Sequence, residues 1–172
     1  MTAALPDIGP ESPNDAPAVD ALIDRAFGPG RYAKAAERLR EGNRRFRDLS
    51  LVARTAGAIV GCVRMWPIRI GQTPAVLLGP FAVEEAWRSL GLGAALIRRA
   101  CEDAKAAGHD VVLLVGDEPY YGPLGFCPAP AGVLLPGPVD PARVLLQALS
   151  PRAAEDLGGA VTPDPDRART CG

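Results

Sequence analysis

The stretch Val83-Glu84-Glu85-Ala86-Trp87-Arg88-Ser89-Leu90-Gly91-Leu92-Gly93-Ala94 places an arginine and two closely spaced glycines between a strand-like run and a helical one. The first N–H groups of a helix have no partner within the helix, and the helix dipole adds partial positive charge there. Glycines let an anion approach the backbone, and Arg88 can add a fixed charge to the same ligand. The spacing predicts a cradle for a phosphate or pyrophosphate. A glycine-tolerant loop that only starts a helix is the plainer interpretation.

The residues on either side of this stretch predict a strand, a helix and a second strand. Pro74–Val83 is strand-like, Leu90–Ala107 repeats apolar residues at helical spacing, and Val111–Val115 is the unbroken apolar run of a strand buried on both faces. Such a unit forms a right-handed parallel crossover. Because proline cannot donate to a strand ladder, Gly79-Pro80 predicts an irregularity in the first strand, of a kind that often lies beside active sites.

The rest of the chain predicts a mixed α/β domain. We expect a helix from the Ser12-Pro13 capping signal to Phe27 and a shorter surface helix over Arg31–Glu41. The other expected elements are an antiparallel meander of Ser50–Thr55, Ala58–Ile70 and Pro74–Val83, a helical turn at Tyr120–Gly125, and a final strand pair of Ala131–Leu135 with Arg143–Leu149. At roughly 100–200 residues per domain, the 172 residues predict one domain over 1–172. Its core spans about 8–150, and a polar, Pro-rich extension at 151–172 is expected to fray in part.

The composition excludes several classes of protein. Hydrophobic residues at 48% and charged residues at 23% are those of a globular protein, and a net charge of −1 gives no global field for nucleic acid or an anionic membrane. His109, the one histidine, is expected in a solvated loop, and the four cysteines form no CxxC pair, so we expect no metal site. With no secretory signal and no apolar run near the ~18 residues that span a bilayer, we expect a cytoplasmic protein without a membrane partner.

Two other phosphate motifs are absent or incomplete. The chain contains no GxxxxGK[ST] sequence, which excludes a P-loop. Gly91-Leu92-Gly93-Ala94-Ala95-Leu96 imitates half of the dinucleotide motif GxGxxG, but Leu96 stands at the third glycine. A dinucleotide-binding module is therefore the weaker alternative.

Two motifs together resemble a known family. Arg88-x-x-Gly91-x-Gly93, after a strand that ends at Val83, resembles the acetyl-coenzyme A motif of the GCN5-related N-acetyltransferases (GNAT). Gly116-Asp117-x-Pro119-Tyr120-Tyr121-x-x-x-Gly125-Phe126 is similar to the YhbS-like bacterial branch of that family. The resemblance covers about residues 8–150. It implies a mixed, mostly antiparallel twisted sheet of six to seven strands, flanked by helices, with a central β-α-β crossover that binds acetyl-CoA.

The resemblance implies an enzyme that moves an acetyl group from acetyl-CoA to a primary amine by direct attack in a ternary complex. The implied cofactor contacts are Ala82, Val83, Arg88, Ser89, Gly91, Leu92, Gly93, Ala94 and Tyr121. The Val83 N–H would stabilise the oxyanion, Tyr121 would protonate the departing thiolate, and Glu84 would act as the base, directly or through a water. The plainer interpretations are a packed ring for Tyr121 and a solvated carboxylate for Glu84, and Tyr120 is interpreted as packing.

The acceptor side is less well defined by the sequence. In the family it is built mainly by the first two helices and the meander, so the implied lining residues are Phe27, Arg31, Tyr32, Trp66 and Arg69. Arginines there suit an acceptor with a carboxylate, although solvated surface is an equal interpretation. The acceptor is a small-molecule or peptide amine of unspecified identity, and dimers are frequent in the family. The alternative function is a catalytically weak CoA or acyl-CoA-binding sensor or interaction module, ahead of the dinucleotide-binding module.

Overall fold

The computed structural model describes residues 4–154 and 156–169. These residues form the strands β1 (Asp7–Pro10), β2 (Leu51–Thr55), β3 (Ala58–Ile70), β4 (Thr73–Val83), β5 (Val111–Val115), β6 (Cys127–Pro128), β7 (Val133–Leu134), β8 (Val144–Ala148) and β9 (Gly159–Pro163). The helices are α1 (Ala16–Phe27), α2 (Ala35–Arg38), α3 (Glu85–Arg88), α4 (Leu92–Ala106) and α5 (Glu118–Tyr121). The 3-10 turns are η1 (Pro13–Asp15), η2 (Pro29–Ala33), η3 (Gly122–Leu124), η4 (Pro141–Arg143), η5 (Pro151–Ala154) and η6 (Pro165–Arg169).

The strands form a mixed, mostly antiparallel sheet in the order β1-β2-β3-β4-β5-β8-β6, with β9 paired to β3 and β7. Successive strands from β1 to β4 are antiparallel, whereas β4 and β5 are parallel and joined through α4. This arrangement confirms the predicted fold class, meander and crossover. The two-residue strands β6 and β7 account for the excess over the expected six or seven strands.

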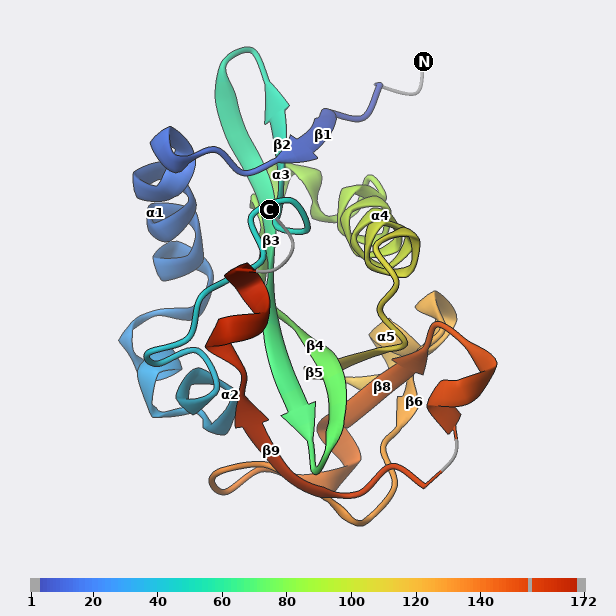
Figure 1. Ribbon diagram of the computed structural model, residues 1–172. Coiled ribbons are helices and arrows are strands. Elements are labelled where there is room, and N and C mark those ends of the chain that lie inside the picture. The colour runs from blue at the N-terminus through green and yellow to red at the C-terminus, as the bar shows by residue number, and fades with distance from the viewer. Residues whose placement is uncertain (1–3, 155, 170–172) are drawn as a thin grey trace.

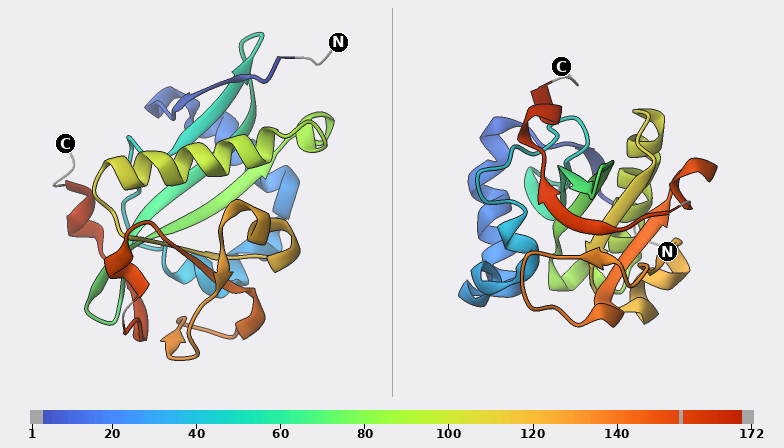
Figure 2. Two further views of the ribbon diagram at one scale, coloured as in Figure 1. Left: turned by 90° about the vertical axis from the view of Figure 1, so that its right-hand side faces the viewer. Right: turned by 60° about the horizontal axis from the view of Figure 1, so that its bottom comes forward.

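Helices cover both faces of the sheet, with α1 and α2 on one side and α4 on the other (Figure 1). The apolar stripe of α4, which includes Leu92 and Leu96, is fully buried, and the helix runs across the strands (Figure 2). Gly61 on β3 allows this close approach, because a Cβ there would lie 2.8 Å from Leu96 Cδ1. On the opposite face, α1 packs with Val19 and Ile23 against the sheet. Burial of both stripes fixes the helices relative to β4.

An irregularity in β4 separates it from β5. Opposite β3 the register shifts, with Val63 facing Phe81 but Met65 facing Leu78, so β4 carries an extra residue at Gly79-Pro80. This confirms the irregularity that the sequence predicts there. The parallel pairing with β5 involves only residues 76–77 and 112–113, although β4 continues to residue 83. Beyond that pairing the two strands diverge and leave a gap at their carboxyl ends.

The N-terminal third differs from the expected elements in two places. Asp7–Pro10 forms β1, an edge strand that pairs with β2 and that the sequence analysis did not predict. The expected helix over Arg31–Glu41 is divided into η2 and the short α2, because Lys34 between them has an extended backbone with φ −76° and ψ 146°. Pro29 and Gly30 at the start of η2 favour a turn over a regular helix.

The C-terminal third corrects two further expectations. Ala131–Leu135 and Arg143–Leu149 do not pair with each other: β8 lies between β5 and β6, and β7 pairs in parallel with β9. The expected fraying after Ser150 is also wrong for residues 159–169. There β9 pairs with the end of β3, Val161 is buried, and the Arg167 guanidinium donates to the carbonyls of Ile68 and Ala75 at 2.9 and 2.6 Å.

A buried ion network joins β1, α1 and β3. The Glu11 carboxylate is inaccessible to solvent and accepts from Arg64 Nη2 at 2.8 Å and from Arg45 Nη2 at 3.0 Å. Arg64 also donates to Asp20 on α1 at 2.8 Å. Glu11 therefore supplies the acceptor oxygens for two guanidinium groups, one of them almost fully buried.

We predict that Glu11→Ala lowers the free energy of unfolding by about 3–5 kcal/mol, because it leaves the Arg64 cation buried without its main partner. Urea titration followed by circular dichroism measures the loss. Glu41→Ala, at an exposed glutamate, is the matched control and should change stability by less than about 0.5 kcal/mol. Equal losses in the two variants would contradict the assigned role of Glu11.

Candidate active site

The first turn of α4 presents backbone donors at the edge of the gap. Gly91 caps the helix in the left-handed region at φ 85°, which favours glycine, and the first intrahelical bond runs from Ala95 N to Gly91 O at 3.1 Å. The N–H groups of Leu92, Gly93 and Ala94 precede that bond and have no carbonyl within the helix to accept them. A Cβ on Gly93 would lie 2.5 Å from the Tyr120 hydroxyl, so glycine is required for α5 to approach here.

Arg88 lies at the mouth of the same gap. Its Nε donates to the Val83 carbonyl at 3.0 Å, which ties the short helix α3 to the end of β4. Ser89, at the end of α3, is exposed. The residues predicted as anion contacts, from Arg88 to Ala94, therefore lie at the junction of β4, α3 and α4.

The backbone of Val83 points into the gap. Glu84 N–H donates to Val60 O on β3 at 2.8 Å, and strand N–H groups alternate from side to side. The N–H groups of Val83 and Phe81 therefore point away from β3 and toward the diverging β5. By the same alternation the N–H of Ala82, which lies opposite Cys62, points toward β3. The backbone N–H of this predicted cofactor residue therefore points away from the gap. Phe81 is the donor that the sequence analysis missed.

Tyr121 lies on α5, opposite this edge of β4, and lines a cleft of about 520 Å³. Its ring stacks edge-on with Tyr120 at 4.9 Å and Phe126 at 6.0 Å between centroids. Gly116 makes room for the ring, because a Cβ there would be 2.3 Å from Tyr121 Cε2. Burial, with smaller effects from Tyr120 and Asp117, raises the pKa of the Tyr121 phenol well above its usual value. The hydroxyl is therefore neutral at physiological pH.

Glu84 is engaged by a neighbouring cation. Its carboxylate forms an ion pair with Arg25 on α1, and the two side chains are 35% and 57% exposed. One of its oxygens is thus used by Arg25.

Residues 16–126 match the family described as "Acetyltransferase (GNAT) family". The chain belongs to this family. It is 34% identical over 119 residues to the uncharacterised N-acetyltransferase YhbS of Escherichia coli strain K12, a match that covers 67% of this chain and 70% of YhbS. These relationships make the protein an acyltransferase and confirm the predicted family and branch.

Two solved GNAT structures resemble more than nine-tenths of the chain. The structure of Escherichia coli YhbS in complex with CoA has a TM-score of 0.78 and 28% identity, and the match covers 95% of this chain and 93% of that one. A GNAT acetyltransferase of Brucella melitensis in complex with acetyl-CoA has a TM-score of 0.68 and 25% identity, with 92% and 95% covered. Both relatives bind a coenzyme A species.

The five predicted acceptor residues do not all lie together in this GNAT chain. Phe27 and Arg31 line the 520 Å³ cleft with Tyr121. Trp66 lies behind its wall and donates from the indole nitrogen to Gly79 O at 2.6 Å. Arg69 is at the far end of β3, ion-paired with Asp164 at 3.0 Å, and so lies outside the cleft. The Tyr32 side chain is outside the described part of the structure.

The cleft also contains charged residues that the sequence analysis did not predict. They are Lys34, Glu37 and Arg40 from the η2–α2 segment, and Asp117, Asp140 and Arg143 from the opposite wall. A helix of four residues shows too little periodicity for its buried face to be identified. Their positions become evident only once α2 packs beside the bulge in β4.

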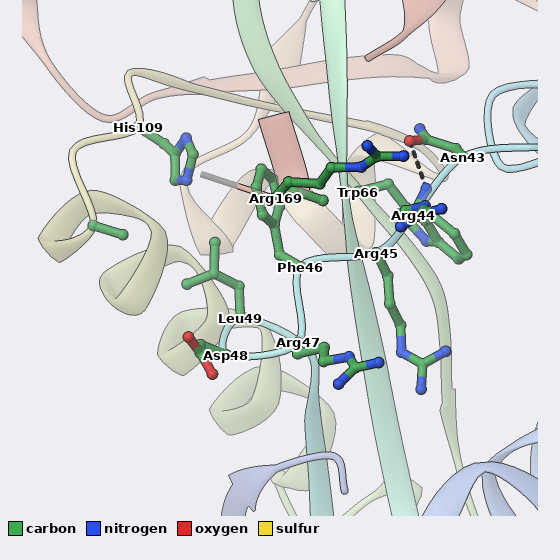
Figure 3. Close-up of a pocket in the computed structure, with 12 residues that line it drawn as sticks. Asn43, Arg44, Arg45, Phe46, Arg47, Asp48, Leu49, Trp66, His109 and Arg169 are labelled. Carbon is green, nitrogen blue, oxygen red and sulfur yellow. Dashed lines mark hydrogen bonds between the residues drawn. The ribbon is translucent and has the colours of Figure 1, made fainter. Parts of the chain in front are cut away.

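A larger cavity of about 740 Å³ lies elsewhere, between the segment 43–49, the end of α4 and η6. Figure 3 shows the arginines of this cavity, with Arg47 and Arg45 directed away from His109. His109 is not the solvated residue that the sequence predicts: its ring lies 4.9 Å from Phe46, and burial, together with Arg167, lowers its pKa. Of the predicted site residues whose side chains the structure describes, only Trp66 borders this cavity.

The next observations concern metal-binding groups and membrane-spanning helices among the described residues. Among them no group of three or more histidine, cysteine, aspartate or glutamate side chains is arranged to hold a metal ion. No helix within 4–154 and 156–169 is long and apolar enough to cross a membrane.

We predict that Gly116→Ala displaces the Tyr121 ring and lowers its pKa toward the usual value of about 10, because the displaced phenol regains water. Tyrosinate absorbance during alkaline titration measures this, with Tyr121→Phe identifying the transition that belongs to Tyr121. Gly122→Ala is the matched control, since a Cβ there meets nothing nearer than 3.9 Å. A Tyr121 transition that is the same in Gly116→Ala as in the natural chain would contradict the packing assigned to Gly116.

Proposed function

We propose that this chain transfers an acetyl group from acetyl-CoA to a primary amine, by direct attack in a ternary complex. The supporting observation is the gap between β4 and β5, which has free backbone donors on one wall and the neutral Tyr121 hydroxyl on the other. The helix terminus at Gly91–Ala94 suits a pyrophosphate at the mouth of this gap. The acceptor would occupy the 520 Å³ cleft that opens from it.

The residues of the gap match the charge changes of the reaction. As the amine nitrogen bonds to the thioester carbon, the Val83 N–H would donate to the developing oxyanion, a contribution of about 3–4 kcal/mol. When the carbon–sulfur bond breaks, the Tyr121 hydroxyl would supply a proton to the sulfur. Glu84 is the proposed base that takes the proton of the amine through a water, with the oxygen that Arg25 leaves available.

We predict that Gly91→Glu abolishes acetyl-CoA binding, because it adds negative charge to the cradle and a side chain to a left-handed position. Calorimetric titration with acetyl-CoA, CoA, NAD and ATP measures the effect. Gly57→Glu, at a left-handed glycine with no atom within 4 Å of its Cβ position, controls for backbone strain and should still bind. Selective binding of NAD by the natural chain would support a dinucleotide-binding module and contradict the proposed acetyl transfer.

We predict that Tyr121→Phe lowers kcat about 10²-fold or more with little change in KM for acetyl-CoA, since the packed ring remains and the proton donor is lost. Steady-state kinetics with a detected acceptor amine checks this. Tyr120→Phe keeps the adjacent ring and serves as the control. An unchanged kcat in Tyr121→Phe would remove Tyr121 from the proposed mechanism. Binding of CoA species without turnover of any amine would favour the sensor alternative.

A further inference from the structure

Arg40 is a largely enclosed cation in the wall of the cleft. Its side chain is 14% exposed, and its Nε and Nη1 are inaccessible to water and have no hydrogen-bond partner in the described part of the chain. Glu37, one turn earlier, approaches Nη1 to 3.6 Å, which balances charge but is too long for a hydrogen bond. The guanidinium thus has a counterion, while its enclosed Nε and Nη1 lack acceptors and its Nη2 is not enclosed.

Such an arrangement is costly without a ligand. Burial lowers the pKa of Arg40 to about 10, and the nearby Arg31 and Arg64 act in the same direction against the opposing effect of Glu37. Buried donors are nearly always paired in folded proteins, and an unpaired one loses its hydration without compensation. The other arginines of the cleft have short-range partners: Arg31 pairs with Asp24 at 2.9 Å, and Arg143 pairs with Asp117 at 3.1 Å.

The position of Arg40 relates it to the reaction cleft. The residue borders the 520 Å³ cleft and an adjoining cavity of about 410 Å³, so it stands where the two meet. Its Nη2 would lie 3.9 Å from a Cβ on Gly79, which places the guanidinium beside the bulge in β4. At about 3.3 Å per strand residue, that point is on the order of 7 Å from Phe81 and 13 Å from Val83 along β4.

We propose that the acceptor amine carries a carboxylate, which binds the Arg40 guanidinium while the amine reaches the gap near Val83. A carboxylate matches a guanidinium in charge and shape, and it would accept from Nη2, the nitrogen of Arg40 that is not enclosed and that lies beside Gly79 in the cleft wall. The spacing along β4 favours an amine and a carboxylate separated by several bonds, as in an ω-amino acid or a short peptide. This substrate class rests on the proposed acetyl transfer, whereas the carboxylate site can be tested without it.

The kinetic test compares pairs of amines that differ only in charge. Glycine, β-alanine, 4-aminobutyrate, 5-aminopentanoate and 6-aminohexanoate are each assayed beside the corresponding amide. We expect the longer acids to be acetylated with a lower KM than their amides. In Arg40→Met, the KM for these acids should rise about 10- to 100-fold, with the amides and acetyl-CoA unaffected. Arg40→Lys should recover part of the loss, and Arg44→Gln, an exposed arginine outside the cleft, should behave as the natural chain.

Equal KM values for acids and amides in the natural chain would overturn the proposal, as would equal effects of Arg40→Met on both. Two measurements do not depend on turnover. Calorimetry should show saturable binding of 5-aminopentanoate to the natural chain in the presence of CoA and its loss in Arg40→Met, and no saturable binding in the natural chain would also overturn the proposal. Arg40→Met should unfold at an equal or higher urea concentration, since methionine needs no acceptor. Failure of acetyl-CoA to bind, with 5-aminopentanoate binding intact, would instead refute the acetyl transfer.

Discussion

The loss of pairing between β4 and β5 is the constraint on which the rest of the site depends. The two strands share a ladder only at residues 76–77 and 112–113, and the extra residue at Gly79-Pro80 turns β4 away before its carboxyl end. Proline contributes no N–H at this point, so the bulge leaves no buried donor without a partner at residue 80. The N–H groups of Phe81 and Val83 are then directed toward the gap instead of being used by β5. A continuous ladder would consume the groups that the proposed reaction needs.

The charges around this gap are mostly neutralised in local pairs, and this makes the exceptions informative. Glu11 forms ion pairs with Arg45 and Arg64. Arg25 pairs with Glu84, and Arg143 pairs with Asp117. Each arginine in these pairs has a carboxylate close by that balances its charge locally. Arg40 differs because the Glu37 carboxylate balances its charge without accepting a hydrogen bond from it. Electroneutrality and hydrogen-bond satisfaction are separate requirements, and a ligand can meet the second when the first is already met.

Local signals explain which parts could be predicted from the sequence. The periodicity of α4, the apolar run of β5 and the consecutive residues Arg88–Ala94 each carry their information within one short segment. The structure has a helix, a strand and a helix start at these three places. In contrast, β9 contains one buried residue, Val161, and its pairing partner lies about 90 residues earlier in the chain, so no local pattern indicates it. The prediction places Arg69 on the acceptor side because the meander strand that contains it belongs to that side. However, β3 has 13 residues and extends well beyond the cleft. Arg40 depends on how a four-residue helix packs, which only the tertiary structure reveals.

The burial of Tyr121 restricts how it can act under the proposed mechanism. An ordinary phenol has a pKa of about 10 and an ordinary thiol about 8.5, so full proton transfer from tyrosine to a free thiolate is unfavourable by about 2 kcal/mol in water. The raised pKa of Tyr121 makes the difference between the two pKa values larger if the sulfur keeps its solution basicity. The same apolar surroundings, however, penalise a thiolate as they penalise a phenolate, so sulfur and oxygen are shifted in the same direction. Tyr121 is therefore best suited to donate a hydrogen bond as charge develops on sulfur, with transfer completed only as the carbon–sulfur bond breaks. Its packing against Tyr120, Phe126 and Gly116 keeps the hydroxyl neutral and in place for that step.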